Sequence, residues 1–161
     1  MSFSIRQAVL EDGPDIARMN SFLAAETEGL RLDPDVITAG VLNLLQSPQR
    51  GRYFVACHGP QVIGQLMLTY EWSDWRNGEI WWLQSVYVQQ DSRRQGVFRG
   101  LLQHVMSLAH ETPGVIGLRL YVEQHNEAAH AVYQNLGFTQ PGYLVLERLS
   151  PHARLQRLDE T

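Results

Sequence analysis

The sequence contains little of what builds disulfides, thiolate metal clusters or membrane spans. Among its 161 residues there is one cysteine, Cys57, so no disulfide can form within the chain. The six histidines share no metal-ligand spacing, and we expect no metal. No run approaches the roughly 18 apolar residues of a membrane span, and the first residues lack the apolar core of a signal peptide. From these absences we expect a cytoplasmic protein without a membrane partner.

The chain also lacks an excess of positive charge, since its formal net charge is −4. Non-specific nucleic-acid binding needs a cationic surface that displaces phosphate counterions, so no nucleic-acid partner is expected. Hydrophobic residues make up 44% of the chain and charged residues 19%, which is typical of a chain that folds around a core. Its length suits one domain over residues 1–161, with a polar tail at 150–161.

The hydrophobic pattern predicts an α+β fold. Apolar residues recur at helical spacing in four segments, residues 14–27, 34–47, 95–111 and 126–136. Strands are expected at residues 3–9, 52–58, 61–71, 79–88, 115–122 and 138–148, the last interrupted at Pro141 and Gly142 by a bulge or a hairpin turn. We therefore expect a mainly antiparallel central sheet of about six or seven strands, flanked by about four helices.

A polar turn at residues 89–96 joins one of these strands to the third helix. Gly96 stands where that helix begins, and Arg93 and Arg94 precede it. The first N–H groups of a helix have no partner within the helix, and its dipole favours an anion there. Glycine lets a phosphate approach the main chain closely. The turn predicts a pyrophosphate site, and without a P-loop lysine or a three-glycine fingerprint it disfavours a nucleotide hydrolase or a dinucleotide-binding dehydrogenase.

The fourth predicted helix carries a second group of candidate residues. Asn126 is a good N-cap, and Ala129, His130 and Tyr133 follow it along one side of the helix. Tyr133 has two interpretations. Its ring can pack on Leu136 and Phe138, or its hydroxyl can donate to a leaving group.

Together these two segments resemble the motifs of the GNAT superfamily of N-acetyltransferases, which use acetyl-CoA. Arg93 and Gly96 match the first and fourth places of the motif Gln/Arg-x-x-Gly-x-Gly/Ala, whereas Phe98 stands where a small residue is usual. Residues 126–138 are similar to the later motif, Asn-x-x-Ala followed by Tyr-x-x-Leu-Gly-Phe. The motifs occur in the expected order, and the resemblance covers nearly the whole chain.

The resemblance implies how acetyl-CoA would be held. Main-chain amides of residues 94–99 would bind its pyrophosphate, and the main chain of Val86 and Val88 would pair with its pantetheine arm as if with an added strand. The expected cofactor-binding residues are Val86, Tyr87, Val88, Arg93, Arg94, Gln95, Gly96, Val97, Phe98, Arg99, Asn126 and Tyr133.

The resemblance also implies the reaction, a direct attack of a primary amine on the thioester through a tetrahedral intermediate. The amine would belong to a small molecule or a protein, and Tyr133 would act as general acid to the departing thiolate. Many relatives carry a glutamate in the middle of the strand at residues 79–88, and this chain does not. Glu79 at the start of that strand and Glu123 at the end of the next are the remaining candidates for a base that acts through a water.

Acceptor contacts are expected near the same strand. Trp81 and Trp82 point to opposite faces, so that one packs against a helix while the other lines the acceptor groove or binds an amine through its ring. Gln84 and Glu123 complete this set, and a homodimer is a further implication of the resemblance. The alternative is a module that senses acetyl-CoA without turnover. The missing glutamate favours this alternative, and Tyr133 counts against it.

Overall fold

Five strands form the central sheet in the computed structural model, which describes residues 2–153 and 156–158. They lie in the order β1-β3-β4-β5-β6, and only β5 and β6 are parallel to each other. A two-stranded antiparallel sheet pairs β2 with β7. The strands are β1 (Ser4–Gln7), β2 (Leu30–Arg31), β3 (Gly51–His58), β4 (Gln61–Ser73), β5 (Gly78–Val88), β6 (Val115–Leu120) and β7 (Gln156–Arg157).

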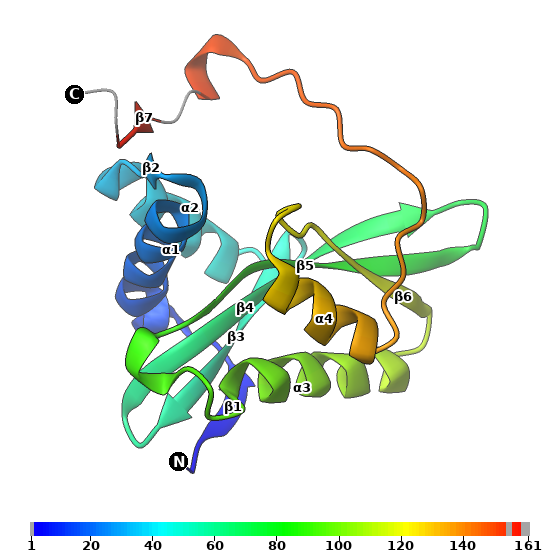
Figure 1. Cartoon of the computed structure of the whole chain (residues 1–161), viewed down its shortest axis with the longest axis horizontal. Helices are drawn as coiled ribbons and strands as arrows, with labels where there is room; N and C mark the ends of the chain where they lie inside the picture. Colours follow the sequence, from blue (N-terminus) through cyan, green and yellow to red (C-terminus); the bar gives the residue numbers. More distant parts are fainter. Residues whose placement is uncertain (1, 154–155, 159–161) are drawn as a thin grey trace.

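Four helices cover the two faces of the central sheet (Figure 1). They are α1 (Gly13–Glu28), α2 (Pro34–Leu45), α3 (Val97–Glu111) and α4 (Glu127–Asn135), with short 3-10 turns η1 (Leu10–Asp12), η2 (Gln90–Ser92) and η3 (Pro151–Ala153). Their ends follow local chemistry: the side chain of Asp33 accepts the N–H groups of Asp35 and Val36 at the start of α2. The α+β fold and its four helices are confirmed.

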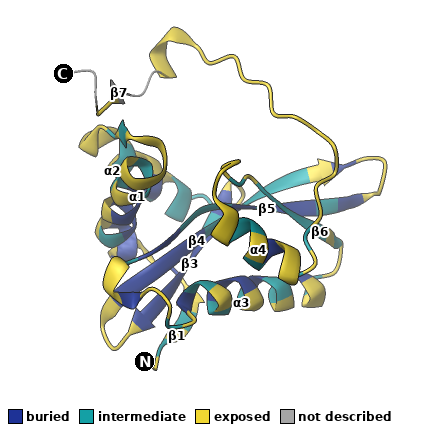
Figure 2. Ribbon diagram, in the orientation of Figure 1, coloured by how far each residue is buried: buried dark blue, intermediate teal, exposed yellow. Residues whose placement is uncertain are grey.

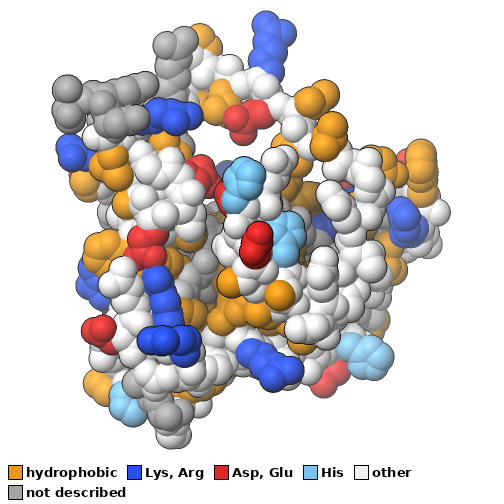
Figure 3. All heavy atoms as spheres, in the orientation of Figure 1, with side chains coloured by type: hydrophobic (Ala, Val, Ile, Leu, Met, Phe, Trp, Pro, Cys, Tyr) orange, Lys and Arg blue, Asp and Glu red, His pale blue; other side chains and the backbone are white. Residues whose placement is uncertain are grey.

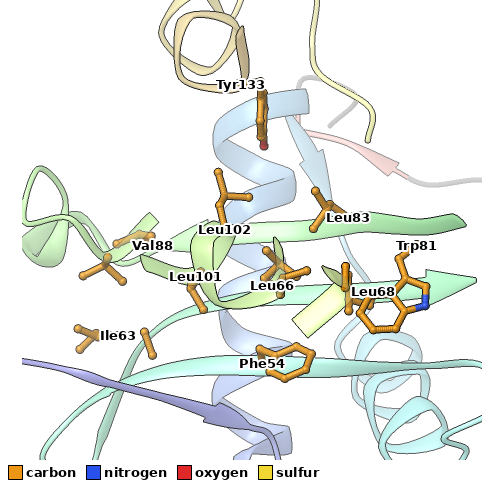
Figure 4. Close-up of a cluster of buried hydrophobic side chains, with 14 residues drawn as sticks. Phe54, Ile63, Leu66, Leu68, Trp81, Leu83, Val88, Leu101, Leu102 and Tyr133 are labelled. Atoms are coloured by element: carbon orange, nitrogen blue, oxygen red, sulfur yellow. The ribbon is translucent and has the colours of Figure 1, made fainter. Parts of the chain in front are cut away.

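Two apolar cores result, one on each face of the sheet (Figure 2). One packs α3 and α4 on Trp81, Leu66 and Leu68, and Figure 4 shows its central side chains. The other packs α1 and α2 on Tyr53, Val55 and neighbouring strand residues. Both α1 and α3 contact β5, so this strand is packed between the two helical layers.

The predicted last strand, residues 138–148, is wrong. Residues 139–150 run as an extended chain with no regular secondary structure, and all are exposed. We call them the strap. Both of its ends are attached, since the N–H of Phe138 donates to the carbonyl of Tyr133 (3.0 Å) and β7 pairs with β2. An apolar segment becomes a strand only where a sheet edge is there to pair with it, and within the described residues the strap lies on none. The central sheet therefore has five strands rather than about six or seven.

The predicted polar tail at residues 150–161 contains η3 and β7. The N–H of Leu158 donates to the carbonyl of Gly29 (2.9 Å), so this end of the chain lies beside the end of α1. Residues 154–155 and 159–161 lie outside the described residues.

An ion pair between the exposed Arg6 and the buried Asp12 joins β1 to the start of α1. Asp12 is 6% exposed and accepts two hydrogen bonds from the Arg6 guanidinium (2.7 and 2.9 Å) and one from the N–H of Val9 (2.8 Å). The hydrogen bonds from Arg6 hold the pKa of Asp12 below its usual value, against the opposing effect of burial. The carboxylate thus stabilises the fold in its ionised form.

We expect Asp12→Asn to lower the free energy of unfolding by about 1–2 kcal/mol at pH 7, because it weakens charged hydrogen bonds to Arg6. Since the folded-state pKa is depressed, this difference is full at neutral pH and shrinks as the pH falls below about 4. Urea unfolding at pH 7 and pH 3 measures it. Asp15→Asn is the matched control, because Asp15 makes an exposed ion pair with Arg18 (2.6 Å) whose loss should change stability by about 0.5 kcal/mol or less. If both variants lose the same free energy of unfolding, the Asp12 carboxylate does not have the stabilising role described here.

Candidate active site

A bulge in β5 opens the central sheet. Gln65 pairs with Tyr87 and Met67 with Gln84, so Ser85 and Val86 on β5 oppose a single residue of β4. Ser85 has φ of 49°, in the left-handed region that side chains rarely adopt. The last parallel pair between β5 and β6 is Leu83 with Leu120. From Gln84 to Val88, the edge of β5 that faces β6 therefore has no partner strand among the described residues.

A buried polar network lies behind the bulge. Gln65 is fully buried, and its side-chain amide donates to the carbonyl of Ser85 (3.2 Å) and to Asn20 Oδ1 (2.9 Å). Asn20 in turn donates to the hydroxyl of Tyr53 (3.0 Å). The network connects α1, β3, β4 and β5 at the one position where the main chain of β5 is strained. It fixes the place where β5 departs from β6.

The predicted pyrophosphate turn follows the bulged strand. Arg94 (φ 60°) and Gly96 (φ 83°) are both left-handed, and Gly96 caps the N-terminus of α3. Within the described part of the chain, the main-chain N–H groups of residues 94–99 donate no hydrogen bond. Two left-handed residues so close together turn several N–H groups toward one place, the arrangement that binds anions.

A cavity of about 440 Å³ lies at this turn. A β-carbon added to Gly96 would meet no atom within 4 Å, so the glycine borders open space. The cavity brings together residues from the end of β5, the turn, α3 and α4. They are Val88, Ser92, Arg93, Arg94, Gly96, Val97, Phe98, Arg99, Val132, Asn135 and Leu136.

Arg93 lines the cavity, but its guanidinium is engaged on α1. It donates to Glu26 (2.6 Å) and to the carbonyl of Val88 (3.0 Å), and it lies over the ring of Tyr87. Glu26 also accepts the Tyr87 hydroxyl (2.6 Å). The position of Arg93 therefore holds the turn against α1. Sequence reasoning missed Glu26, because a contact across 67 residues leaves no local pattern.

The rings of Phe98 and Tyr133 are in contact. The ring of Phe98 contacts Tyr133 edge to face at 5.8 Å between centroids, and Phe138 contacts it from another side at 5.6 Å. Tyr133 is 8% exposed, and its side chain points from α4 toward β5, with its hydroxyl near Leu83 and Leu102 (Figure 4). Burial raises the pKa of Tyr133 to about 12. Both interpretations of Tyr133, a packed ring and an available hydroxyl, are thus compatible with its position.

Four other predicted cofactor residues, Val86, Tyr87, Gln95 and Asn126, do not line the cavity. Gln95 donates its side-chain amide to the carbonyl of Asp91 (2.9 Å), and Asn126 accepts the N–H of Ala129 (3.1 Å) as N-cap of α4. The side chain of Tyr87 faces α1. The N–H of Gln89 donates to the carbonyl of Ile63 on β4, so by strand alternation the main chain of Val86 and Val88 faces the opposite, open edge.

The two tryptophans divide as the alternation predicts. Trp81 is 1% exposed and lies in the core beneath α3, so it is not available to an acceptor. Trp82 lies on the opposite face, where its indole N–H donates to Glu71 (2.6 Å) and its ring lies 4.6 Å from that of Tyr121. Gln84 is on the same face as Trp82 and donates to Thr69 (2.5 Å). Trp82 and Gln84 therefore remain as candidates for acceptor contact, and Trp81 does not.

The two candidate bases lie at different ends of the sheet. Glu79 accepts the indole N–H of Trp81 (2.7 Å) and is six residues before Ser85, roughly 20 Å along the strand. At that distance along the strand Glu79 lies away from the opened edge, and its role as a base stays a prediction. Glu123 lies three residues beyond Leu120, the last residue of β6 that pairs with β5. Its carboxylate accepts the N–H of His125 (2.8 Å).

The described residues form neither a membrane-spanning helix nor a metal cluster. No helix there is long and apolar enough to cross a membrane. Nor does the described part of the chain contain a group of three or more histidine, cysteine or acidic side chains arranged to hold a metal. Cys57 is buried in β3, where burial raises the pKa of its thiol.

Comparison with known proteins identifies the family of this chain. The family model described as Acetyltransferase (GNAT) family matches residues 17–138. The structure of a possible acetyltransferase from Clostridium difficile 630 is 41% identical, with a TM-score of 0.87, and the match covers 94% of this chain and all of that one. No curated protein matches the sequence significantly.

More distant structures share the fold. A predicted acetyltransferase with acetyl-CoA from Clostridium acetobutylicum is 18% identical, with a TM-score of 0.74 over 91% of this chain and 96% of that one. A ribosomal-protein-alanine N-acetyltransferase from Brucella melitensis biovar Abortus 2308 is 17% identical, with the same TM-score over 92% of this chain and 100% of that one. The family model spans three quarters of the sequence, including both motifs and all of β3 to α4. The chain belongs to the GNAT family of acetyltransferases.

Proposed function

We propose that residues 1–161 form one N-acetyltransferase domain that transfers acetyl from acetyl-CoA to a primary amine of a small molecule or a protein. The observation that carries this proposal is the cavity of about 440 Å³ where the free N–H groups of residues 94–99 meet the open edge of β5. A thioester held along that edge presents its carbonyl to the acceptor side of the sheet.

The turn fits a pyrophosphate in both shape and charge. Six main-chain N–H groups, from Arg94 to Arg99, are free to donate, and the positive end of the α3 dipole adds to them. Arg94 and Arg99 line the same cavity, whereas Arg93 holds the turn through Glu26. In this assignment the turn binds through its main chain, and only the outer arginines add side-chain charge.

The edge of β5 fits the pantetheine arm. Its amides can pair with the outward main chain of Val86 and Val88, although the carbonyl of Val88 already accepts from Arg93 Nε (3.0 Å). We infer that Val86 and the N–H of Val88 make these contacts. A main-chain N–H near the bulge would also donate to the oxygen that becomes negative as the amine attacks.

Tyr133 is suited to protonate the departing sulfur. With a pKa of about 12 its hydroxyl stays protonated at neutral pH, and burial rather than a hydrogen bond to a described residue raises that pKa. The rings of Phe98 and Phe138 fix its direction. Phe98 stands where the motif usually has a small residue, and its contact with Tyr133 accounts for a large ring at this position. It supports the proposed acid while narrowing the cavity.

For the base we propose Glu123, acting through a water. Glu123 follows the end of β6, where the pairing with β5 stops, whereas Glu79 lies roughly 20 Å from Ser85 along β5. The acceptor amine would approach over the face that carries Trp82 and Gln84, with Trp82 offering a ring to a cationic group. The second candidate function is acetyl-CoA sensing without turnover, favoured by the lack of a carboxylate within β5 near its bulge.

Acetyl-CoA should raise the midpoint of thermal unfolding, because it binds only the folded state. At a hundred times its dissociation constant the gain is about 2.7 kcal/mol, or roughly 5–10 °C for a chain of this size. Differential scanning fluorimetry measures it, with NAD as a control that also carries a pyrophosphate. The absence of a shift at millimolar acetyl-CoA would refute both candidate functions.

Gly96→Val should weaken acetyl-CoA binding by about 10-fold or more. The side chain would project into the cavity from a residue at φ 83°. Gly114→Val is the matched control, since Gly114 has φ 86° and an equally open β-carbon position but lies past the other end of α3, about 22 Å away. Both variants should lose similar stability. If isothermal titration shows equal affinity in the two, the pyrophosphate site is misplaced.

Tyr133→Phe should lower kcat by roughly 100-fold or more and leave the KM for acetyl-CoA nearly unchanged. The phenylalanine keeps the ring contacts with Phe98 and Phe138, so the thermal midpoint should move little. Release of free thiol with a panel of amines measures turnover and finds the acceptor at the same time. Tyr70→Phe removes a hydroxyl on β4 and serves as the control. An unchanged kcat in Tyr133→Phe, with chemistry limiting the rate, excludes the acid role.

A further inference from the structure

A second hollow, of about 310 Å³, lies at the end of the β4–β5 hairpin, away from the cavity at the turn. Trp72 and Trp75 of the hairpin and Tyr143 of the strap form its apolar wall, and two carboxylates and two arginines also line it. Figure 3 shows hydrophobic and basic side chains side by side at this end of the molecule, on the right of the view. Apolar walls with a few charged groups are typical of a ligand site.

The charged groups of this hollow are not equally engaged. Glu71 accepts hydrogen bonds from Arg119 Nη1 on both of its oxygens (3.0 Å each) and from the indole N–H of Trp82 (2.6 Å). Asp74 accepts a main-chain N–H of its own turn (2.9 Å). Within the described part of the chain, Arg119 Nε and Nη2 donate to no residue, and Arg76 makes neither a hydrogen bond nor an ion pair. The hollow is formally neutral, but its unused groups are cationic donors.

Glu71 and Trp82 hold Arg119 in one orientation. Arg119 of β6 pairs with Trp82 of β5, and its side chain extends across β5 to Glu71 on β4. The ion pair is partly exposed, 30% at Arg119 and 40% at Glu71, so it adds little to stability. It does fix the guanidinium, because Nη1 is bound and only the edge formed by Nε and Nη2 is left. That edge has two parallel N–H donors, the geometry that binds both oxygens of a carboxylate.

The hollow lies in line with the proposed place of acetyl transfer. Trp82 and Arg119 bind the same carboxylate, and Gln84 follows Trp82 by two residues, so all three side chains share one face of the sheet. Ser85, at the bulge, is three residues beyond Trp82, which is roughly 10 Å along the strand. An acceptor whose amine lies at the bulge would therefore reach Arg119 with a group roughly 10 Å from that amine.

We propose that the acceptor is an amine that also carries a carboxylate, and that Arg119 Nε and Nη2 bind this carboxylate roughly 10 Å from the reacting nitrogen. The position of the amine rests on the proposed acetyl transfer, whereas the carboxylate site does not require turnover. Trp82 and Gln84 lie beside the part of the acceptor that connects the two groups. The carboxylate takes no part in the reaction and selects the substrate by its charge.

Glycine peptides test the charge and the distance together. An extended residue spans about 3.3–3.6 Å, so triglycine places its amine and its carboxylate roughly 10 Å apart. Triglycine should bind about 10-fold or more tightly than triglycine amide, which has the same amine without the negative charge, because the carboxylate forms charged hydrogen bonds. Isothermal titration into protein saturated with CoA measures both dissociation constants without turnover. Glycine, whose two groups are too close together, should bind more weakly than triglycine.

Two substitutions of Arg119 test the guanidinium. Arg119→Gln should bring the ratio of the two dissociation constants close to one. Arg119→Lys keeps the charge but lacks the paired N–H edge, so it should keep only part of the preference. Arg18→Gln is the matched control, because it removes the same charge from an exposed ion pair with Asp15 (2.6 Å) on α1. It should leave the preference as it is in the natural chain.

The outcomes separate this site from the proposed reaction. Equal affinity of the natural chain for triglycine and its amide overturns the proposal, and so do the binding of neither peptide and a preference that survives Arg119→Gln. A protein that prefers triglycine but acetylates no amine supports the carboxylate site and contradicts the transferase function. A protein that acetylates amines without a preference for a carboxylate does the reverse.

Discussion

The bulge at Ser85 is the constraint on which the rest of the site depends. A parallel pair such as β5 and β6 would normally close along its whole length, and a closed pair has no edge to offer. One extra residue in β5, held in a left-handed conformation, ends the pairing at Leu83 and leaves residues 84–88 open. The open edge, the turn and the N-terminus of α3 follow each other within about 15 residues of chain, and α4 supplies the remaining lining of the cavity.

A strained residue persists only where its surroundings hold it, and two sets of contacts do so here. Gln65 binds the carbonyl of Ser85 from behind, within a buried network that reaches α1 through Asn20. Beyond the bulge, Glu26 of the same helix holds Arg93 and Tyr87. Helix α1 thus reaches Ser85 through Gln65, and through Glu26 it holds Tyr87 and the turn that follows β5. This explains why a helix on the face away from α3 can matter to cofactor binding, although it does not line the cavity.

The sequence predicted the parts that depend on local patterns. The four helices, the first five predicted strands, the N-cap at Asn126 and the turn at Gly96 follow from spacing and from single-residue preferences, and each lies within a few residues of its expected place. The separation of Trp81 from Trp82 followed from strand alternation. The Glu26–Arg93 contact and the Gln65 network could not be predicted, because they join residues 20 to 67 positions apart. The engagement of Arg93, and the distance of Glu79 from the gap, became visible only once the register of β5 was known.

The strap shows why a segment with the sequence pattern of a strand can lack strand structure. Residues 143–149 have the composition of a strand, and the structure keeps them extended. The strap lacks a second backbone within hydrogen-bonding distance, and the presence of such a backbone cannot be read from any single residue. A helix satisfies its own main chain, so a helical pattern suffices to predict a helix. A strand needs a neighbour that the pattern does not specify, and that neighbour can belong to the same chain or to another copy. Among the described residues, the outer edge of β6 and the strap both lack such a neighbour.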